Sequence, residues 1–416
     1  MSKNSLRVAL LLGWRQIRHA NVWTTTLIIF VMMLTFLNLV VVAGILVGLI
    51  EGSVKAYSEQ YTGDIFISTP AGEEYIERST ELLATLKNIP GITAYATRAT
   101  EGVTVEANYR TRRDPQELRD TVGTKLAGIV PLTEDQVTGL SRFVVDGEYL
   151  DPNTEGYILV GANLLHQYAP DFGEAFDTLE EVYPGTRVRL TASGRTKEYI
   201  VRGVINSKVD ETSRRVFMLE DEFFRFVGRT NLNINEVAIR AENKLAAGKI
   251  KSQLIGSGVA DYANIRLSRE ALPQALEDII VTFELLGNGI SSIGLLVSSI
   301  TVFIVVFVNA ITRRKYIGIL KGIGIRAGAI ELSYVIQSLT YALAGAGIAL
   351  VIIYGFLVPF FNAHPIDFPF SDGILVAPLS GTLIRLIILI IATLIAGYIP
   401  AWLIIKKNTL DSILGR

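Results

Sequence analysis

The stretch Thr312-Arg-Arg-Lys-Tyr-Ile-Gly-Ile-Leu-Lys-Gly-Ile-Gly-Ile-Arg326 decides the fold, because it is a short basic connector between two long apolar segments. Residues 290–311 before it contain no charged residue, and residues 327–361 after it contain only Glu331. A membrane-spanning helix needs about 20 apolar residues, so each flank is long enough to be one. Short loops rich in Lys and Arg stay cytoplasmic, which fixes the expected orientation of the chain.

Two further apolar runs, residues 22–50 and 374–405, bring the expected number of spans to four. Of the 39 Lys and Arg residues, 12 lie in three short segments (residues 3–18, 313–326 and 406–416), all expected on the cytoplasmic side. Residues 55–270 instead carry 26 basic and 32 acidic residues. The chain has no cysteine, which excludes disulfides and thiolate metal sites. We therefore expect an α-helical membrane protein with four transmembrane helices and a large extracytoplasmic α+β domain inserted between the first and second.

The expected domain divisions follow from these runs, with both termini in the cytoplasm and the chain multi-pass in the cell (inner) membrane. Because a helix rises 1.5 Å per residue, one over residues 22–60 would be about 58 Å long, beyond the ~30 Å hydrocarbon core, and would project as a stalk. In chain order the divisions are a cytoplasmic amphipathic N-terminal helix (1–20), the first span and stalk (21–60), the extracytoplasmic domain (61–272), a second stalk and span (273–312), the cytoplasmic connector (313–326), the third span (327–361), an outer loop (362–378), the fourth span (379–405) and a cytoplasmic tail (406–416).

The insert alternates short β-branched runs with turn residues, which predicts a mixed α/β domain. Helical spacing predicts helices over residues 73–87 and 245–255. Because domains commonly run about 100–150 residues, we expect two lobes, with residues 151–229 forming the more β-rich one. The expected strands are residues 64–68, 92–97, 102–106, 125–130, 157–160, 186–191, 198–205, 215–219 and 236–240.

The N-terminal segment, residues 2–20, has the pattern of an amphipathic helix on the inner membrane surface. Leu6, Leu10, Gly13, Trp14 and Ile17 share one side, and basic residues fall on the other flank. Trp14, Arg15 and Arg18 are the expected membrane-interface residues. The alternative is an unstructured basic segment that only sets topology. A signal peptide is not expected, because residues 22–50 exceed the apolar region of such peptides.

Within the connector, Ile317, Leu320 and Ile323 recur at helical spacing, while Arg314, Lys315 and Lys321 point elsewhere. Such a helix can seat its apolar face in a groove on a cytoplasmic partner, with Gly322 and Gly324 ending it. The alternative is a basic loop that only sets topology. Small residues at 342–347 and 287–294 predict close helix packing, with lipid-facing flexibility as the alternative.

Catalytic, metal and cofactor sites are not expected in this chain. It lacks the P-loop pattern for ATP and the G-x-S-x-G pattern, and residues 322–327 match G-x-G-x-x-A without the strand that a dinucleotide site requires. His19, His166 and His364 have no second His or Cys at the spacing of a metal site. Glu284, Glu331 and Arg385 lie near span ends, where snorkelling explains them, so an ion-driven carrier is not expected. No nucleic-acid partner is expected either.

The connector sequence at 316–324, Y-I-G-I-L-K-G-I-G, resembles the signature E-I-G-I-L-K-A-I-G of FtsX-like permeases, the family of MacB-type exporters and lipoprotein-releasing LolC/LolE-type permeases. Residues 13–18 resemble the family's A-W-R-N-L-R, and residues 396–401 with 411–414 resemble its C-terminal A-G-x-x-P-A and D-P-x-x-A-L. Segments at 146–150, 157–161 and 203–205 resemble the family's MacB-like periplasmic domain. Tyr316 replaces the family's acidic residue, and Ser412 replaces a Pro, so a salt bridge at position 316 is not assumed.

This resemblance implies a permease subunit of an export-type (mechanotransmission, type VII-like) ABC transporter, which moves its extracytoplasmic domain to extrude lipoprotein, lipid, peptide or drug. ATP and Mg would be bound by a partner, a separate cytoplasmic ABC ATPase. A second permease copy or homologue, membrane lipids, and a periplasmic adaptor or outer-membrane partner complete the expected assembly. The implied ATPase-coupling residues are Arg314, Lys315, Tyr316, Ile317, Gly318, Ile319, Leu320, Lys321, Gly322, Ile323 and Gly324.

One alternative comes from a different class: an FtsX-like signalling or scaffold protein that regulates an extracytoplasmic cell-wall hydrolase. An intramembrane protease is not expected, because no catalytic dyad is visible in the sequence. The substrate itself stays open.

Overall fold

The computed structural model describes residues 3–110, 119–168, 177–312, 314–364, 366–368, 371–373 and 375–405, and the chain divides into two compact units. One is an α/β unit that spans Glu51–Leu276 and so includes the last turns of α2. The other is a helical unit built from α1 (Lys3–Arg18), most of α2 (Val22–Tyr57), α8 (Gln274–Thr312), α9 (Arg314–Gly322), α10 (Ala327–Ile352), η7 (Ile353–Leu357), α11 (Val358–Ala363) and α12 (Leu379–Ile405). A two-stranded sheet, β11 (Ile366–Phe368) and β12 (Ser371–Gly373), lies between α11 and α12 in the chain.

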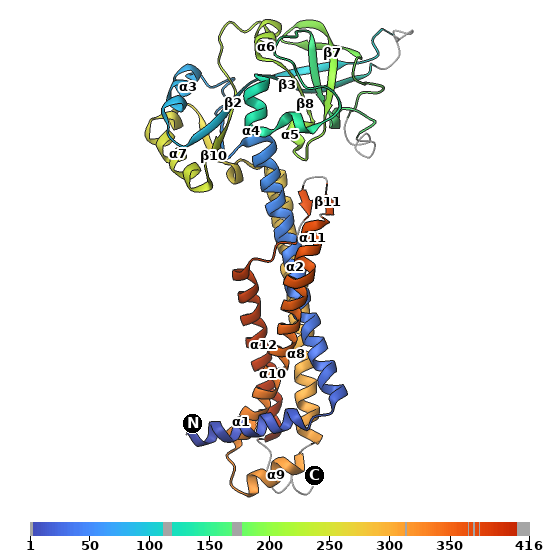
Figure 1. Ribbon diagram of the computed structural model, residues 1–416, viewed down its shortest axis with the longest axis vertical. Coiled ribbons are helices and arrows are strands. Elements are labelled where there is room, and N and C mark those ends of the chain that lie inside the picture. Colours follow the sequence, from blue (N-terminus) through green and yellow to red (C-terminus); the bar gives the residue numbers. More distant parts are fainter. Residues whose placement is uncertain are drawn as a thin grey trace. The chain divides into compact units, whose positions relative to one another are not determined.

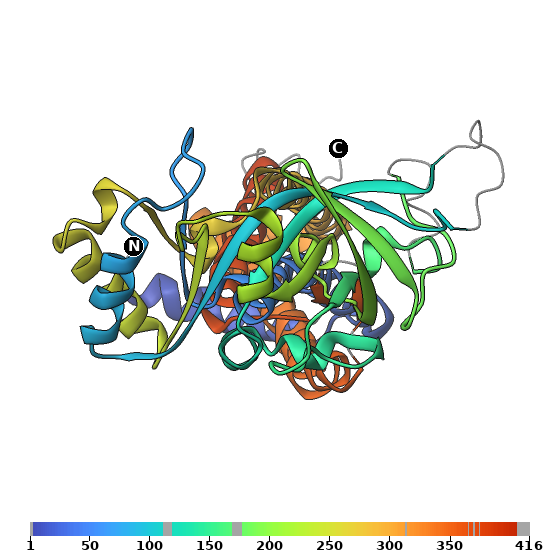
Figure 2. The same cartoon turned by 90° about the horizontal axis from the view of Figure 1, so that it is seen from above.

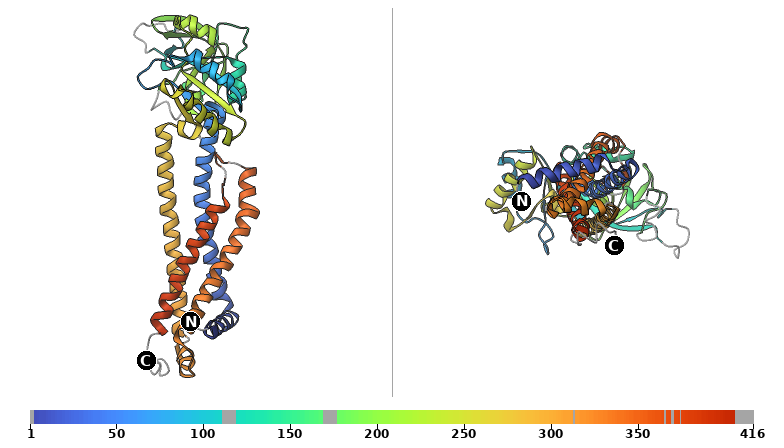
Figure 3. Two further views of the ribbon diagram at one scale, coloured as in Figure 1. Left: turned by 90° about the vertical axis from the view of Figure 1, so that its left-hand side faces the viewer. Right: turned by 90° about the horizontal axis from the view of Figure 1, so that it is seen from below.

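Four helical segments of the described chain are long and apolar enough to cross a membrane: Val22–Thr62, Gln274–Thr312, Ala327–Ala363 and Leu379–Ile405. Figures 1 and 3 show α8, α10 and α12 running alongside one another. The predicted number of apolar helices and a mixed α/β insert are confirmed, whereas their insertion in a membrane and the domain divisions stay predictions.

Neighbouring helices of this unit approach one another closely at glycine residues, which have no side chain. A Cβ at Gly345 of α10 would lie 2.6 Å from Cβ of Met32 and 2.9 Å from the carbonyl oxygen of Ile29, both on α2. A Cβ at Gly294 of α8 would lie 3.0 Å from Oδ1 of Asn38. A Cβ at Gly347, by contrast, would meet nothing within 4 Å. The predicted close packing is therefore confirmed at Gly345 and Gly294 but not at Gly347.

In its described residues the α/β unit has one sheet of ten strands, nine of which follow the order β10-β1-β9-β2-β3-β8-β5-β7-β4. The sixth strand, β6, pairs with both β2 and β7, so six strands (β2, β3, β8, β5, β7 and β6) close into a barrel. The strands are β1 (Ile65–Ser68), β2 (Ile92–Glu106), β3 (Thr121–Ile129), β4 (Val144–Gly147), β5 (Tyr157–Gly161), β6 (Arg187–Ala192), β7 (Arg195–Ile205), β8 (Arg215–Leu219), β9 (Glu236–Ala241) and β10 (Asn264–Leu267).

Short helices complete this unit. The α-helices are α3 (Ser79–Asn88), α4 (Pro131–Thr138), α5 (Asp210–Ser213), α6 (Glu220–Val227) and α7 (Lys244–Gly256). The others are the π-helix η1 (Ser58–Thr62) and the 3-10 helices η2 (Leu140–Phe143), η3 (Ala162–Leu164), η5 (Val259–Asp261) and η6 (Ser268–Ala271).

The two largest hydrophobic clusters of the α/β unit lie along this one sheet. The barrel is filled by alternating residues such as Val103 and Val105 of β2 and Ile158 and Val160 of β5, which are all buried. The second core lies where α3 and α7 cover β1 and β9, at one end of the sheet (Figure 2). The predicted lobe boundary at residues 151–229 is wrong, because β2 and β3 also build the barrel. The strands predicted at 92–97 and 102–106 are one strand, since residues 98–101 pair with β3.

The end of α2 is bound into the α/β unit through η1. Arg98 of β2 donates to both carboxylate oxygens of Glu134 on α4 at 2.9 and 2.7 Å, and to the carbonyl oxygen of Tyr61 at 2.7 Å. Arg215 of β8 donates to both oxygens of Glu236 on β9 at 2.8 Å and to the Tyr61 hydroxyl at 2.7 Å. Both guanidinium groups lie near the Tyr61 ring, 4.8 and 5.0 Å from its centroid. We call these five residues the Tyr61 cluster.

All members of the Tyr61 cluster are buried, so their charges must compensate one another. Burial alone would raise the pKa of Glu236, but the guanidinium groups of Arg215 and Arg98 outweigh it and lower the pKa from 4.5 to about 2. Burial also raises the pKa of Tyr61 well above its usual range. Neighbouring contacts extend this attachment, because Gln60 Oε1 accepts from the Ser207 hydroxyl at 2.7 Å and from the Lys208 amide at 3.0 Å.

The first prediction concerns the stability of the Tyr61 cluster at acidic pH. Because Glu236 has a lower pKa in the folded protein than in the unfolded chain, its stabilisation is complete above about pH 4.5 and is lost as the pH falls toward about 2. We expect wild-type amide protection at residues 58–62 and 236–241 to weaken across that window. Glu236→Gln should lower protection by on the order of 3 kcal/mol already at about pH 5 and flatten the pH dependence.

Hydrogen exchange with mass spectrometry on the full chain in detergent measures this protection. Glu148→Gln is the matched control, because Glu148 pairs with Arg202 but its side chain is 78% exposed, where an ion pair contributes little. Equal protection of wild type and Glu236→Gln at about pH 5 would contradict the prediction.

The second prediction concerns helix packing. Gly345→Val should destabilise the helical unit by about 1–3 kcal/mol, because its side chain would collide with the α2 backbone. Gly347→Val, two residues away with open space around it, should behave like the wild type. Thermal unfolding of the detergent-solubilised protein, followed by circular dichroism, compares the two variants. Equal unfolding temperatures would refute the close contact.

Candidate functional site

The predicted connector is a helix that ends on glycine. Residues from Arg314 to Gly322 form α9, and Gly324 has a positive φ of 90°. The Gly324 amide donates to the Lys321 carbonyl, and the Ile325 amide donates to the Leu320 carbonyl, both at 3.0 Å. This pair of bonds is the Schellman arrangement, which requires the left-handed backbone that glycine adopts readily. Arg313 lies outside the described residues.

The α9 helix has two apolar stripes with different surroundings. Ile317 is only 3% exposed and Leu320 is half-buried, both within the core of the helical unit. Tyr316, Ile319 and Ile323 are 69%, 52% and 70% exposed. The prediction that Ile317, Leu320 and Ile323 form one partner-binding face is therefore wrong, because the first two hold α9 to its own bundle. The three exposed residues, at helical spacing, form what we call the free stripe.

The lysines of α9 also differ in their surroundings. Lys321 Nζ donates to the Ile405 carbonyl oxygen at 2.5 Å, at the last residue of α12. The ammonium group of Lys321 thus donates to a backbone oxygen in the last described turn of α12. Lys315 is exposed, and Gly318 is buried beside Ile317. Lys321 therefore ties the connector to the end of α12.

The N-terminal helix α1 lies against α10, which Figure 1 shows crossing its lower end. A Cβ at Gly13 would be 3.1 Å from Cγ2 of Ile336, and Gln16 Nε2 donates to the Ser333 hydroxyl at 3.4 Å. Gly13 and Ile17, two of the five residues predicted to share the apolar side of this helix, thus pack on the bundle. Trp14, Arg15 and Arg18 are exposed, and their contact with a membrane stays a prediction.

The C-terminal motif is a packing motif on α12. Ala396, Gly397, Pro400 and Ala401 are buried on one face of the helix. A Cβ at Gly397 would lie 2.4 Å from the Ser338 hydroxyl oxygen of α10, so a side chain at this position would require Ser338 to shift. The predicted tail, residues 406–416, lies outside the described residues.

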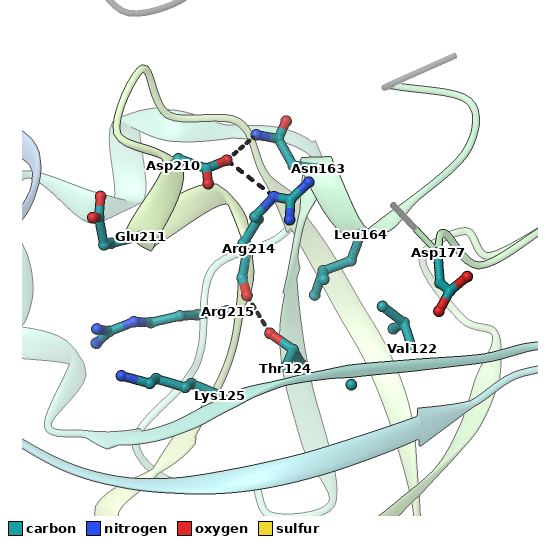
Figure 4. A pocket seen from close by; sticks show the side chains of 11 residues that line it. Val122, Thr124, Lys125, Asn163, Leu164, Asp177, Asp210, Glu211, Arg214 and Arg215 are labelled. Atoms are coloured by element: carbon teal, nitrogen blue, oxygen red, sulfur yellow. Dashed lines mark hydrogen bonds and ion pairs between the residues drawn. The ribbon is translucent and has the colours of Figure 1, made fainter. Parts of the chain in front are cut away.

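A polar pocket of about 410 Å³ lies in the α/β unit among β3, η3 and α5. Asp210 accepts from Asn163 Nδ2 at 2.8 Å and pairs with Arg214 Nε at 3.1 Å, and the Thr124 hydroxyl donates to the Arg214 carbonyl (Figure 4). Glu211 and Arg215 also line it; Glu211 accepts from the hydroxyl of Tyr57 at the end of α2, and Arg215 donates to the hydroxyl of Tyr61 in η1. The pocket therefore adjoins the Tyr61 cluster.

The three histidines lie apart, at the end of α1, after η3 and after α11. Among the described residues, no group of three His, Cys, Asp or Glu side chains could hold a metal ion.

Comparison with known proteins finds a similarity in the C-terminal part of the chain. Residues 288–409 match the family model described as FtsX-like permease C-terminal. No curated protein matches the chain.

Two solved structures are similar to part of the chain. The extracellular domain of the noncanonic ABC-type transporter YknZ from Gram-positive bacteria is 16% identical, with a TM-score of 0.33, over 49% of this chain and 98% of that domain. The periplasmic region of MacB from Actinobacillus actinomycetemcomitans is 14% identical, with a TM-score of 0.32, over 49% of this chain and 88% of that region.

The family match contains the connector and the helices on both sides of it, so the predicted resemblance is confirmed for that part of the chain. Residues 288–409 are similar to the C-terminal part of FtsX-like permeases.

Proposed function

We propose that the chain is the permease subunit of an export-type ABC transporter. Segments of α2, α8, α10 and α12 cross the cell (inner) membrane, with both termini in the cytoplasm and the α/β unit outside. A separate cytoplasmic ATPase binds ATP and Mg, and two permease chains, identical or related, form the transporter. The family match at residues 288–409 supports this proposal.

The free stripe of α9 is the observation that carries the proposal. It presents Tyr316, Ile319 and Ile323 on the connector, while the opposite stripe is packed in the bundle. An amphipathic helix with apolar residues at such spacing binds naturally in a groove of a partner protein. The basic residues Lys315 and Arg326 beside it are exposed and suit an acidic rim on that partner.

Force can pass from α9 through contacts that are already made. The α9 helix is fixed to the bundle by Ile317 and by the bond from Lys321 to Ile405. The α2 helix runs unbroken from Val22 to Tyr57 and continues into η1, where the Tyr61 cluster fixes it. In the proposed cycle the ATP-bound ATPase favours one of two arrangements of the permease, so it must bind that arrangement more tightly.

The substrate class stays open among lipoprotein, lipid, peptide and hydrophobic drug. A periplasmic adaptor or outer-membrane partner belongs to the same proposal and would bind the α/β unit.

The third prediction tests the free stripe. Tyr316→Asp with Ile323→Asp should abolish capture of an ABC ATPase, because two carboxylates would have to be desolvated in an apolar groove. Affinity purification in mild detergent followed by mass spectrometry measures capture. Leu232→Asp is the matched control, an equally drastic change at a residue of the α/β unit that is 74% exposed.

Two outcomes separate the alternatives. If wild type captures no ABC ATPase but does capture a cell-wall hydrolase, the scaffold role replaces the transporter role. If the double variant and the wild type capture equal amounts of ATPase, α9 is not the coupling element. Ile317→Asp should instead unfold the bundle, because its side chain is buried.

The fourth prediction concerns Lys321. Lys321→Met should leave ATPase capture intact, since the free stripe is unchanged, but should loosen the end of α12. We expect roughly tenfold faster amide exchange at residues 401–405, corresponding to a bond of about 1.5 kcal/mol. Lys315→Met, on the same helix, is the matched control. Unchanged exchange in Lys321→Met would show that the contact with Ile405 has no role.

A further inference from the structure

A groove between α10 and α12 combines an apolar floor with one carboxylate. It has a volume of about 530 Å³, and Leu332, Val335, Leu394 and Ile395 line it together with Glu331 and Tyr398. The two helices are in extensive contact and lie side by side in Figure 1. This volume is in the range of sites that hold one small molecule or lipid chain. The groove is separate from the free stripe of α9 and from the pocket in the α/β unit.

The charges at this groove are placed at one end of the helices. Glu331 is in the second turn of α10, which begins at Ala327, and Tyr398 is two turns before the end of α12 at Ile405. Among the described residues Glu331 has no ion-pair partner. Its position near the N-terminal end of α10 favours a negative charge. Arg326, directly before α10, is exposed. A carboxylate with no ion-pair partner in the described part of the chain therefore lies at an apolar groove.

We propose that this groove binds an aminophospholipid of the cytoplasmic leaflet. One acyl chain lies along Leu332, Val335 and Ile395, and the ammonium group binds Glu331. The inference rests on the proposed insertion and orientation in the membrane, because only these put the mouth of the groove at headgroup depth. At that depth a primary ammonium offers the Glu331 carboxylate both an opposite charge and hydrogen bonds.

The groove selects against other lipids by the same chemistry. An anionic headgroup without an amine would place its charge beside Glu331, and a choline headgroup cannot donate a hydrogen bond to the carboxylate. The expected preference for phosphatidylethanolamine over phosphatidylcholine is about two- to fivefold, the range of a partly exposed ion pair.

Trp402 provides a reporter on the protein itself. It follows Tyr398 by one helical turn on the same face of α12, and the chain has three tryptophans in all. In a Trp14→Phe/Trp23→Phe background, fluorescence quenching of Trp402 by acyl-brominated phosphatidylethanolamine or phosphatidylcholine, in otherwise identical vesicles, gives the relative affinity of the two lipids. The full chain is used, and circular dichroism confirms the fold of each variant.

Three variants make the test specific. Glu331→Gln should remove the preference for the amine lipid, whereas Glu284→Gln, an exposed acid of α8, should keep it. Val335→Phe should fill the groove and weaken quenching by both lipids.

Several results would overturn the proposal. These are equal quenching by both lipids in the wild type, an unchanged preference in Glu331→Gln, or unchanged quenching in Val335→Phe. If Val335→Phe instead changes the oligomeric state measured by cross-linking, a second copy of the chain occupies the groove. Capture of the ATPase is scored in parallel and should be unaffected by all three substitutions, so failure of the lipid site and failure of the transporter role are distinguishable.

Discussion

The burial of the Arg98 guanidinium is the constraint on which the α/β unit and the end of α2 both depend. Arg98 stands on β2 at the point where the strand changes partners, since it pairs with Glu236 of β9 on one side and with Ile129 of β3 on the other. The same side chain binds the Tyr61 carbonyl of η1. A buried guanidinium is tolerated only where nearly all its donors are used, so any displacement of η1 would leave part of the charge uncompensated. The end of α2 is therefore held in one favourable position against the sheet.

The connector is under a different constraint. The short helix α9 has to pack on its own bundle and still expose a surface to a partner. It does so by carrying apolar residues on two stripes, with Ile317 and Leu320 turned inward and Tyr316, Ile319 and Ile323 turned outward. The glycine at 324 ends the helix and brings Ile325 back onto the same core as Leu320. Lys321 then joins the inward side to the end of α12. In the proposed transporter, a push on the outward stripe reaches α10 and α12 without a flexible link.

Sequence reasoning succeeded where the signal is local. Uninterrupted apolar runs gave the long helices, and alternation gave most strands to within a few residues. It failed where the answer depends on distant pairing. The closure of six strands into a barrel depends on β6 meeting β2, about 85 residues away in the chain, which periodicity does not encode. Helix α4 was missed although Pro131 at its start is a helix signal, because its buried Glu134 reads as a surface residue until Arg98 is placed beside it. For α9, both stripes have helical spacing, so the sequence could not say which one the bundle would bury.

The shared strand β2 also limits how the α/β unit can move. Residues 92–98 belong to the part covered by α3 and α7, and residues 98–106 belong to the barrel, so one continuous strand is shared by both cores. A hinge between them would have to break ladder hydrogen bonds on both sides of Arg98 and expose its buried charge. Bending is therefore less favourable than moving the unit as one body. If α2 transmits a displacement in the proposed cycle, the whole sheet has to follow η1, and the polar pocket beside the Tyr61 cluster moves with it.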